Sequence, residues 1–217
     1  PVEIAPLHDT IAVLAYGAID DGDGHDVIDP VTFARQLEAL DAAGFETVTL
    51  SEVAAIVAGE QPDLPERPLL ITVDGTHRSA WTTVDPLIEA HGFEAVAFVD
   101  PGLVSDRTTT ARLNWDELEA LAESDRWTIG LGVHDVFTAD DDTSPEAMNA
   151  DLSARIDTKV AQLAERLGRA PTALSYGASG PGAPEATFQA GRASDDLDLV
   201  FTPGDRELVT AYWSATA

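Results

Sequence analysis

Short apolar runs alternate with amphipathic stretches along most of the chain. Seven apolar runs predict β-strands, at 11–16, 45–50, 69–73, 94–99, 127–131, 173–176 and 199–202. Between them, apolar residues recur at helical spacing and predict helices at 30–43, 51–59, 79–91, 113–124 and 145–167. This alternation predicts an α/β fold whose mostly parallel sheet closes into a slightly irregular barrel. We expect residues 1–217 to form a single domain.

The chain is strongly acidic. It has 12 Lys and Arg residues against 39 Asp and Glu residues, so its formal net charge is 12 − 39 = −27, and Lys159 is its one lysine. Such a surface repels nucleic acid and anionic membranes, so we expect neither as a partner. Because salt screens the self-repulsion, the composition favours a protein kept soluble in high salt. The alternative is an ordinary acidic surface on a high-GC bacterial protein.

The sequence also limits the redox chemistry and the membrane association. It contains no cysteine, which excludes disulfides and thiolate metal sites. No stretch reads as a signal peptide or a membrane span, so we expect no membrane insertion in this segment. Because the chain begins at Pro1 without an initiator Met, we interpret it as a processed segment or one part of a longer protein, which leaves export open.

The stretch LLITVDGTHRSAW, from Leu69 to Trp81, is the strongest candidate for chemistry. Its apolar run ends at Asp74 and continues into a glycine and a threonine, which is how a buried strand delivers a carboxylate to a loop. In α/β barrels, catalytic groups lie at this end of the strands. The stretch resembles the first motif of the polysaccharide deacetylases of the NodB-homology type (carbohydrate esterase family 4), where a strand ending in T-F-D-D-G precedes a sequence much like HRSAW.

The resemblance covers nearly the whole chain. AVLAYGAID is similar to the V-L-M-Y-H-x-I that opens many of these deacetylases, with Tyr16 retained and Gly17 in the place of His. Further matches are FARQLEALDAAGFETVTLSE, LIEAHGFEAVAFV and LNWDELEAL. These segments are scaffold, so they imply the family's distorted (β/α) barrel of seven strands and not its activity.

The resemblance implies metal-dependent removal of N-acetyl groups, but the metal ligands are missing. In the family the first Asp of T-F-D-D-G is the general base and the second is a ligand; here Asp74 keeps the first position and Gly75 stands at the second. The outer histidines of the second motif, S-H-T-x-x-H, correspond to Gly132 and Val136. None of these three positions offers a side-chain atom able to coordinate a divalent metal.

Two further motifs of the family are incomplete or missing in this sequence. Of the third motif, Y-P-Y-G, only Tyr176 is kept, and the general-acid His has no counterpart because no His follows His134. Without a metal, the water is not activated and the tetrahedral oxyanion lacks its stabilising charge. The sequence therefore predicts a chain that has lost hydrolytic activity, with Asp74 as a vestigial general base and no cofactor.

Three functions are compatible with this pattern. The first is a non-hydrolytic carbohydrate-associated or structural module of an envelope or extracellular protein, with a cytoplasmic location as the alternative. Its partners are a polysaccharide or other domains of a longer chain, and its groove candidates are Tyr16, His77, His134, Asp135 and Tyr176. The second is an active carbohydrate N-deacetylase with zinc or another divalent metal in a site rebuilt around Asp74, His77 and His134. The third is a scaffold domain without a ligand.

Several of these residues also have purely structural interpretations. His77 could simply begin a helix, and Asp74 could cap it. Trp81, Trp115 and Trp127 could line a sugar groove, but Trp81 and Trp115 occupy apolar-face positions that are typical of core residues.

Overall fold

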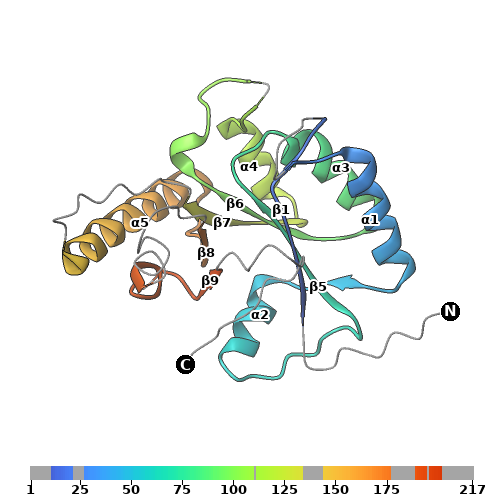
Figure 1. Cartoon of the computed structure of the whole chain (residues 1–217), viewed down its shortest axis with the longest axis horizontal. Coiled ribbons are helices and arrows are strands. Elements are labelled where there is room, and N and C mark those ends of the chain that lie inside the picture. Colours follow the sequence, from blue (N-terminus) through green and yellow to red (C-terminus); the bar gives the residue numbers. More distant parts are fainter. Residues whose placement is uncertain are drawn as a thin grey trace.

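The computed structural model describes residues 11–21, 27–109, 111–133, 144–176, 189–194 and 196–201. Its main sheet is parallel throughout and curls into a half-barrel (Figure 1), with strand order β1-β5-β6-β7-β8-β9 and a short β4 that also pairs with β5. The strands are β1 (Ala12–Tyr16), β4 (Glu46–Thr47), β5 (Pro68–Asp74), β6 (Ala95–Val99), β7 (Trp127–Val133), β8 (Ala173–Tyr176) and β9 (Leu199–Phe201).

The predicted seven strands and the distorted barrel-like α/β fold are confirmed. Within the described residues, β1 and β9 form the two ends of the sheet. The second predicted strand is much shorter than 45–50, because Thr49 caps a helix that begins at Leu50. A small parallel pair, β2 (Ala18–Ile19) and β3 (Val27–Ile28), was not predicted, since two residues are too few for a periodic pattern.

The helices largely follow the predicted amphipathic stretches. They are α1 (Pro30–Ala42), α2 (Leu50–Val57), α3 (Asp85–His91), α4 (Trp115–Glu123) and α5 (Pro145–Leu167), with a short 3₁₀ turn η2 (Pro101–Leu103). The single helix predicted for 79–91 was wrong, because its first part is a π-helix, η1 (Ala80–Val84). At the start of α2, Thr49 and Glu52 form a reciprocal capping box, so the helix begins just before the expected Ser51.

Both faces of the central strands are buried, as a parallel sheet between two layers requires. Along β5, Leu69, Ile71 and Val73 belong to the larger core cluster, which includes residues of α1, α3, α4 and α5. Leu70 belongs to a second cluster built mainly from the strands themselves and from α2. This second cluster includes Val13, Val96, Phe98, Ala173 and Leu199. Side chains from five strands meet there, so this face is the concave inside of the curled sheet.

Candidate functional site

The candidate site lies where the parallel strands end at their carboxyl edge. Asp74 is the last residue of β5. Backbone hydrogen bonds join the segment after it to the stretch before α4. Leu113 N–H donates to Thr76 O at 3.2 Å, and Arg78 N–H donates to Ala111 O at 3.1 Å. His77 forms an isolated β-bridge with Arg112. The residues after Asp74 are thus fixed against a second loop at the carboxyl end of the barrel strands, where such folds place their chemistry.

Asp74 has an unusual environment for a carboxylate. Its Oδ1 atom is buried and has no hydrogen-bond partner in the described part of the chain, although the residue as a whole is partly exposed. Burial raises the pKa of the Asp74 carboxyl from 3.8 to about 6, and a hydrogen bond with the Ser175 side chain opposes this shift. A buried polar atom without a partner costs about 1–3 kcal/mol, so it requires an explanation.

A side chain at position 75 would strain the backbone and displace the His77 ring. The φ of +91° at Gly75 lies in the left-handed region, and a Cβ placed there would lie 2.9 Å from Cδ2 and 3.2 Å from Nε2 of His77. The imidazole of His77 therefore fills the space in which a metal-binding side chain at position 75 would begin. A glycine satisfies both constraints, because it tolerates positive φ and leaves the space to the ring.

The other family ligand positions are only partly described. Gly132 lies in β7 opposite Ser175 of β8, whose side chain hydrogen bonds to Asp74, so this position is close to the carboxylate. Val136 lies outside the described residues, as do the groove candidates His134 and Asp135. Gly75 and Gly132 do not fit a divalent metal, since neither has a side-chain donor. In the described ranges, no group of three His, Cys, Asp or Glu residues could hold one.

The remaining groove candidates differ in burial. Tyr16 is buried, donates its hydroxyl to Gln36 at 3.0 Å, and packs edge-on against Phe33. Burial raises the pKa of Tyr16 to about 12. Tyr176 is also buried, in the larger core cluster. Both tyrosines are largely enclosed by the core, while His77 is partly exposed beside Asp74.

The structure also tests the structural interpretations of the tryptophans, Asp74 and His77. Trp115 and Trp127 are buried in the core, and the Trp127 indole donates to Asp85 at 2.8 Å. Trp81 is partly buried against the same core, as its apolar-face position predicts. Asp74 is not a helix cap: the residue before η1 is Ser79, which makes no side-chain capping bond. His77 does not begin the helix either, since it lies in the bridge to Arg112.

Sequence reasoning missed a polar cluster beside the site. Thr76 is completely buried; its hydroxyl accepts from Asp100 N–H at 3.1 Å and donates to Asp100 O at 3.2 Å. The buried Asp100 carboxylate accepts from Gly102 N–H at 2.9 Å and pairs with Lys159 Nζ at 2.8 Å. The one lysine of the chain therefore neutralises a buried aspartate after β6, and its rarity was the only signal in the sequence.

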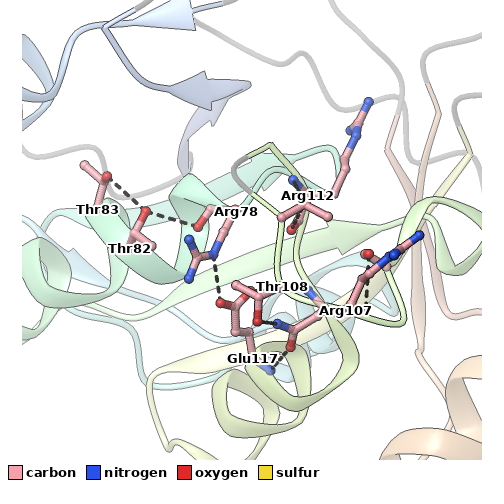
Figure 2. Close-up of polar contacts among 10 residues, drawn as sticks. Arg78, Thr82, Thr83, Arg107, Thr108, Arg112 and Glu117 are labelled. Carbon is pink, nitrogen blue, oxygen red and sulfur yellow. Dashed lines mark hydrogen bonds and ion pairs between the residues drawn. The ribbon is translucent and has the colours of Figure 1, made fainter.

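A second ion pair also anchors the segment after β5. Arg78 Nε donates to Glu117 Oε1 at 2.8 Å (Figure 2). Glu117 also completes a capping box with Asn114 at the start of α4, and Asn114 Nδ2 donates to Thr108 at 3.2 Å. The segment after β5, the 104–114 loop and α4 thus form one hydrogen-bonded unit.

The fold matches known structures along most of its length. The structure of IcaB from Ammonifex degensii aligns with a TM-score of 0.68 at 23% identity, covering 83% of this chain and 80% of that one. A de-N-acetylase from Aggregatibacter actinomycetemcomitans aligns with a TM-score of 0.70 at 14% identity, covering 83% and 85%. The Streptococcus pyogenes deacetylase PplD aligns with 0.64 at 18% identity, covering 86% and 81%. The chain has the NodB-like polysaccharide deacetylase fold.

This deacetylase fold confirms the resemblance carried by the sequence motifs. No family model matches the sequence, and no curated protein matches it either. At these identities the structural matches establish the fold and not the activity. In the described residues no helix is long and apolar enough to cross a membrane.

Proposed function

We propose that this domain is a non-hydrolytic carbohydrate-binding module, built on the deacetylase fold and belonging to an envelope or extracellular protein. The observation that carries the proposal is the environment of Gly75. A φ of +91° and the present position of the His77 ring both disfavour a ligand side chain at the position where the resemblance implies one. The backbone angle and the packing at position 75 thus both suit the glycine that stands there.

The groups left at the strand ends favour binding over hydrolysis. Amide hydrolysis near neutral pH needs an activated water and a charge that stabilises the oxyanion, which the family's metal would supply together. The Asp74 carboxyl can act as a base or as a hydrogen-bond acceptor, but one carboxyl cannot fill both roles of the metal. It can still accept a hydrogen bond from a sugar hydroxyl or amide.

Glycan titration tests the binding proposal directly. N-acetylglucosamine and glucosamine oligomers are added to the whole domain in a calorimeter. We expect at least one of these oligomers to give saturable binding heat. We also expect no acetate release from the acetylated oligomers over hours. Flat titrations across these oligomers and several other glycans would leave only the structural role for the domain.

Metal content tests the loss of the catalytic centre. After dialysis against zinc, we expect elemental analysis to find no bound zinc in the native domain. We expect about one zinc per chain in a variant that carries Gly75→Asp, Gly132→His, Val136→His and His77→Ala. The last change removes the ring that blocks a Cβ at position 75. The same variant with His77 retained is the matched control and should bind zinc more weakly, because the clash then persists.

A rebuilt zinc site remains the second candidate function, and one observation favours it. The unpaired Asp74 Oδ1 and the His77 imidazole both flank Gly75, and carboxylate and imidazole are zinc ligands. This candidate predicts one zinc per native chain, acetate release from acetylated glycans, and loss of both in Asp74→Ala. Zinc in the native domain would contradict the non-hydrolytic proposal.

A further inference from the structure

Among the described residues, Asp74 combines a buried unpaired oxygen with an absence of charged partners. Of these residues, only Ser175 offsets the effect of burial on the pKa of the carboxyl, through its side chain. Oδ1 has no hydrogen-bond partner among the described residues. Such an atom is stabilised once a donor or a cation reaches it. The residue as a whole is partly exposed at the carboxyl end of β5, although its Oδ1 atom is buried, so a ligand must displace part of its cover to pair with the carboxyl.

Two cations on the segments around Asp74 already pair with other carboxylates. Lys159 pairs with Asp100, which follows the neighbouring strand β6, and Arg78 pairs with Glu117 (Figure 2). Each of these ion pairs has an N–O distance of 2.8 Å and an acidic partner whose side chain is at most 10% exposed. Rearrangement of either cation toward Asp74 would leave a buried carboxylate unpaired elsewhere, which is strongly unfavourable. The missing partner of Asp74 must therefore come from outside these pairs.

The chemistry of the missing partner can be inferred from charge. A neutral donor leaves the negative charge of the carboxylate in place, whereas an ammonium group donates a hydrogen bond and also neutralises that charge. A net charge of −27 also raises the local concentration of cations around the molecule. Among glycans, N-deacetylation of an amino sugar leaves a primary amine on the sugar, which carries a positive charge when protonated.

We propose that the domain binds de-N-acetylated amino sugars in preference to N-acetylated ones, with the sugar ammonium paired to the Asp74 carboxylate. This inference rests on the proposed carbohydrate-binding function and specifies its ligand class. An N-acetyl amide offers one neutral N–H and brings a methyl group, so it cannot neutralise the carboxylate. The domain therefore recognises the form of the polysaccharide that a deacetylase produces.

Calorimetric titration with three tetrasaccharides of glucosamine, N-acetylglucosamine and glucose tests this ligand class. We expect the glucosamine oligomer to bind the whole domain at least about tenfold more tightly than the other two. Asp74→Asn should remove this preference while leaving the fold intact by circular dichroism. Asp106→Asn is the matched control: it removes the same charge from an exposed position on the 104–114 loop and should keep the preference.

A measurement on the native chain does not depend on any variant. The ¹³C resonance of the Asp74 side-chain carboxyl should shift when the glucosamine oligomer is added, and it should stay in place with the acetylated oligomer. A preference that survives Asp74→Asn would overturn the inference, because it would arise from the overall charge of the molecule.

Other results separate the inference from the proposed function. Tighter binding of the acetylated oligomer, or of an oligouronate attracted by Arg107 and Arg112, would overturn the inference and leave carbohydrate binding standing. Arg107 is exposed and Arg112 partly exposed on the 104–114 loop (Figure 2). If no oligosaccharide binds, both the inference and the proposed function fail.

Discussion

At the residue scale, Gly75 shows how a lost ligand can become part of the local structure. Gly92, at the end of α3, also has a positive φ. A Cβ at Gly92 would have no atom within 4 Å, whereas a Cβ at Gly75 would lie 2.9 Å from the His77 ring. The two glycines thus share the backbone requirement and differ in packing. This difference makes Gly92 a natural control for Gly75.

Gly75→Ala should destabilise the domain more than Gly92→Ala. Both changes place an L residue at positive φ, which costs about 1–2 kcal/mol, and Gly75→Ala adds a clash worth roughly 1–3 kcal/mol. Urea unfolding of both variants in the native and His77→Ala backgrounds gives a double-mutant cycle. We expect His77→Ala to recover about 1 kcal/mol for position 75 and nothing for position 92. Equal costs at the two positions would show that the ring does not fill this space.

Asp74 should make the domain less stable as the pH rises. Burial raises the pKa of its carboxyl from 3.8 to about 6, so the folded state disfavours the charged form. Its contribution to stability is fully present below pH 3.8 and is lost as the pH rises through about 6. A shift of about two units corresponds to about 3 kcal/mol.

The comparison with Asp74→Asn isolates this effect from the many other acidic groups. Between about pH 4 and about pH 7, the free energy of unfolding of the native chain should fall by about 2–3 kcal/mol relative to the variant. A constant offset from the amide cancels in this difference. Parallel pH profiles from urea titrations would contradict a buried carboxyl at position 74.

At the element scale, the sequence predicted strands and helices well where apolar residues follow a regular period. β5, β6 and β8 lie within a residue of their predicted positions, because their apolar runs end at polar or glycine residues. The π-helix of η1 was missed, since its apolar residues also fit the period of an α-helix. The ion pair of Asp100 with Lys159 joins residues 59 positions apart, so no local pattern could predict it.

The Asp100–Lys159 pair should be the main polar link between α5 and the turn after β6. Lys159→Met leaves a buried carboxylate without its cation, which costs about 3–5 kcal/mol, although Gly102 N–H still donates to it. Arg155→Met is the control on the same helix: it removes an exposed pair with Asp151 and should cost less than about 1 kcal/mol. Thermal unfolding of both variants gives the comparison. Similar costs would show that Lys159 remains hydrated in solution.

At the scale of the whole molecule, the fold could be predicted and the candidate site only in part. Apolar periodicity predicted the alternating α/β order, and the T-V-D-G-T-H-R-S-A-W stretch predicted which strand end carries Asp74. The sequence also predicted that Gly75 lacks a ligand atom. It could not show that His77 fills the space or that Asp74 Oδ1 is unpaired, because both depend on backbone angles and on contacts between distant strands.

Net charge is a property of the whole molecule, and it leads to a prediction about salt. A formal charge of −27 repels itself in the compact state, and ions screen this repulsion over about 10 Å at 0.1 M and about 3 Å at 1 M. We therefore expect the midpoint of thermal unfolding at pH 7 to rise steeply with KCl. Near the isoelectric point, about 4.1, the net charge vanishes, so the unfolding midpoint should depend much less on the KCl concentration. Comparing the two slopes separates screening from the general strengthening of apolar contacts by salt, which acts at both pH values. Equal slopes would mean that self-repulsion does not limit stability, and the high-salt interpretation of the composition would then fail.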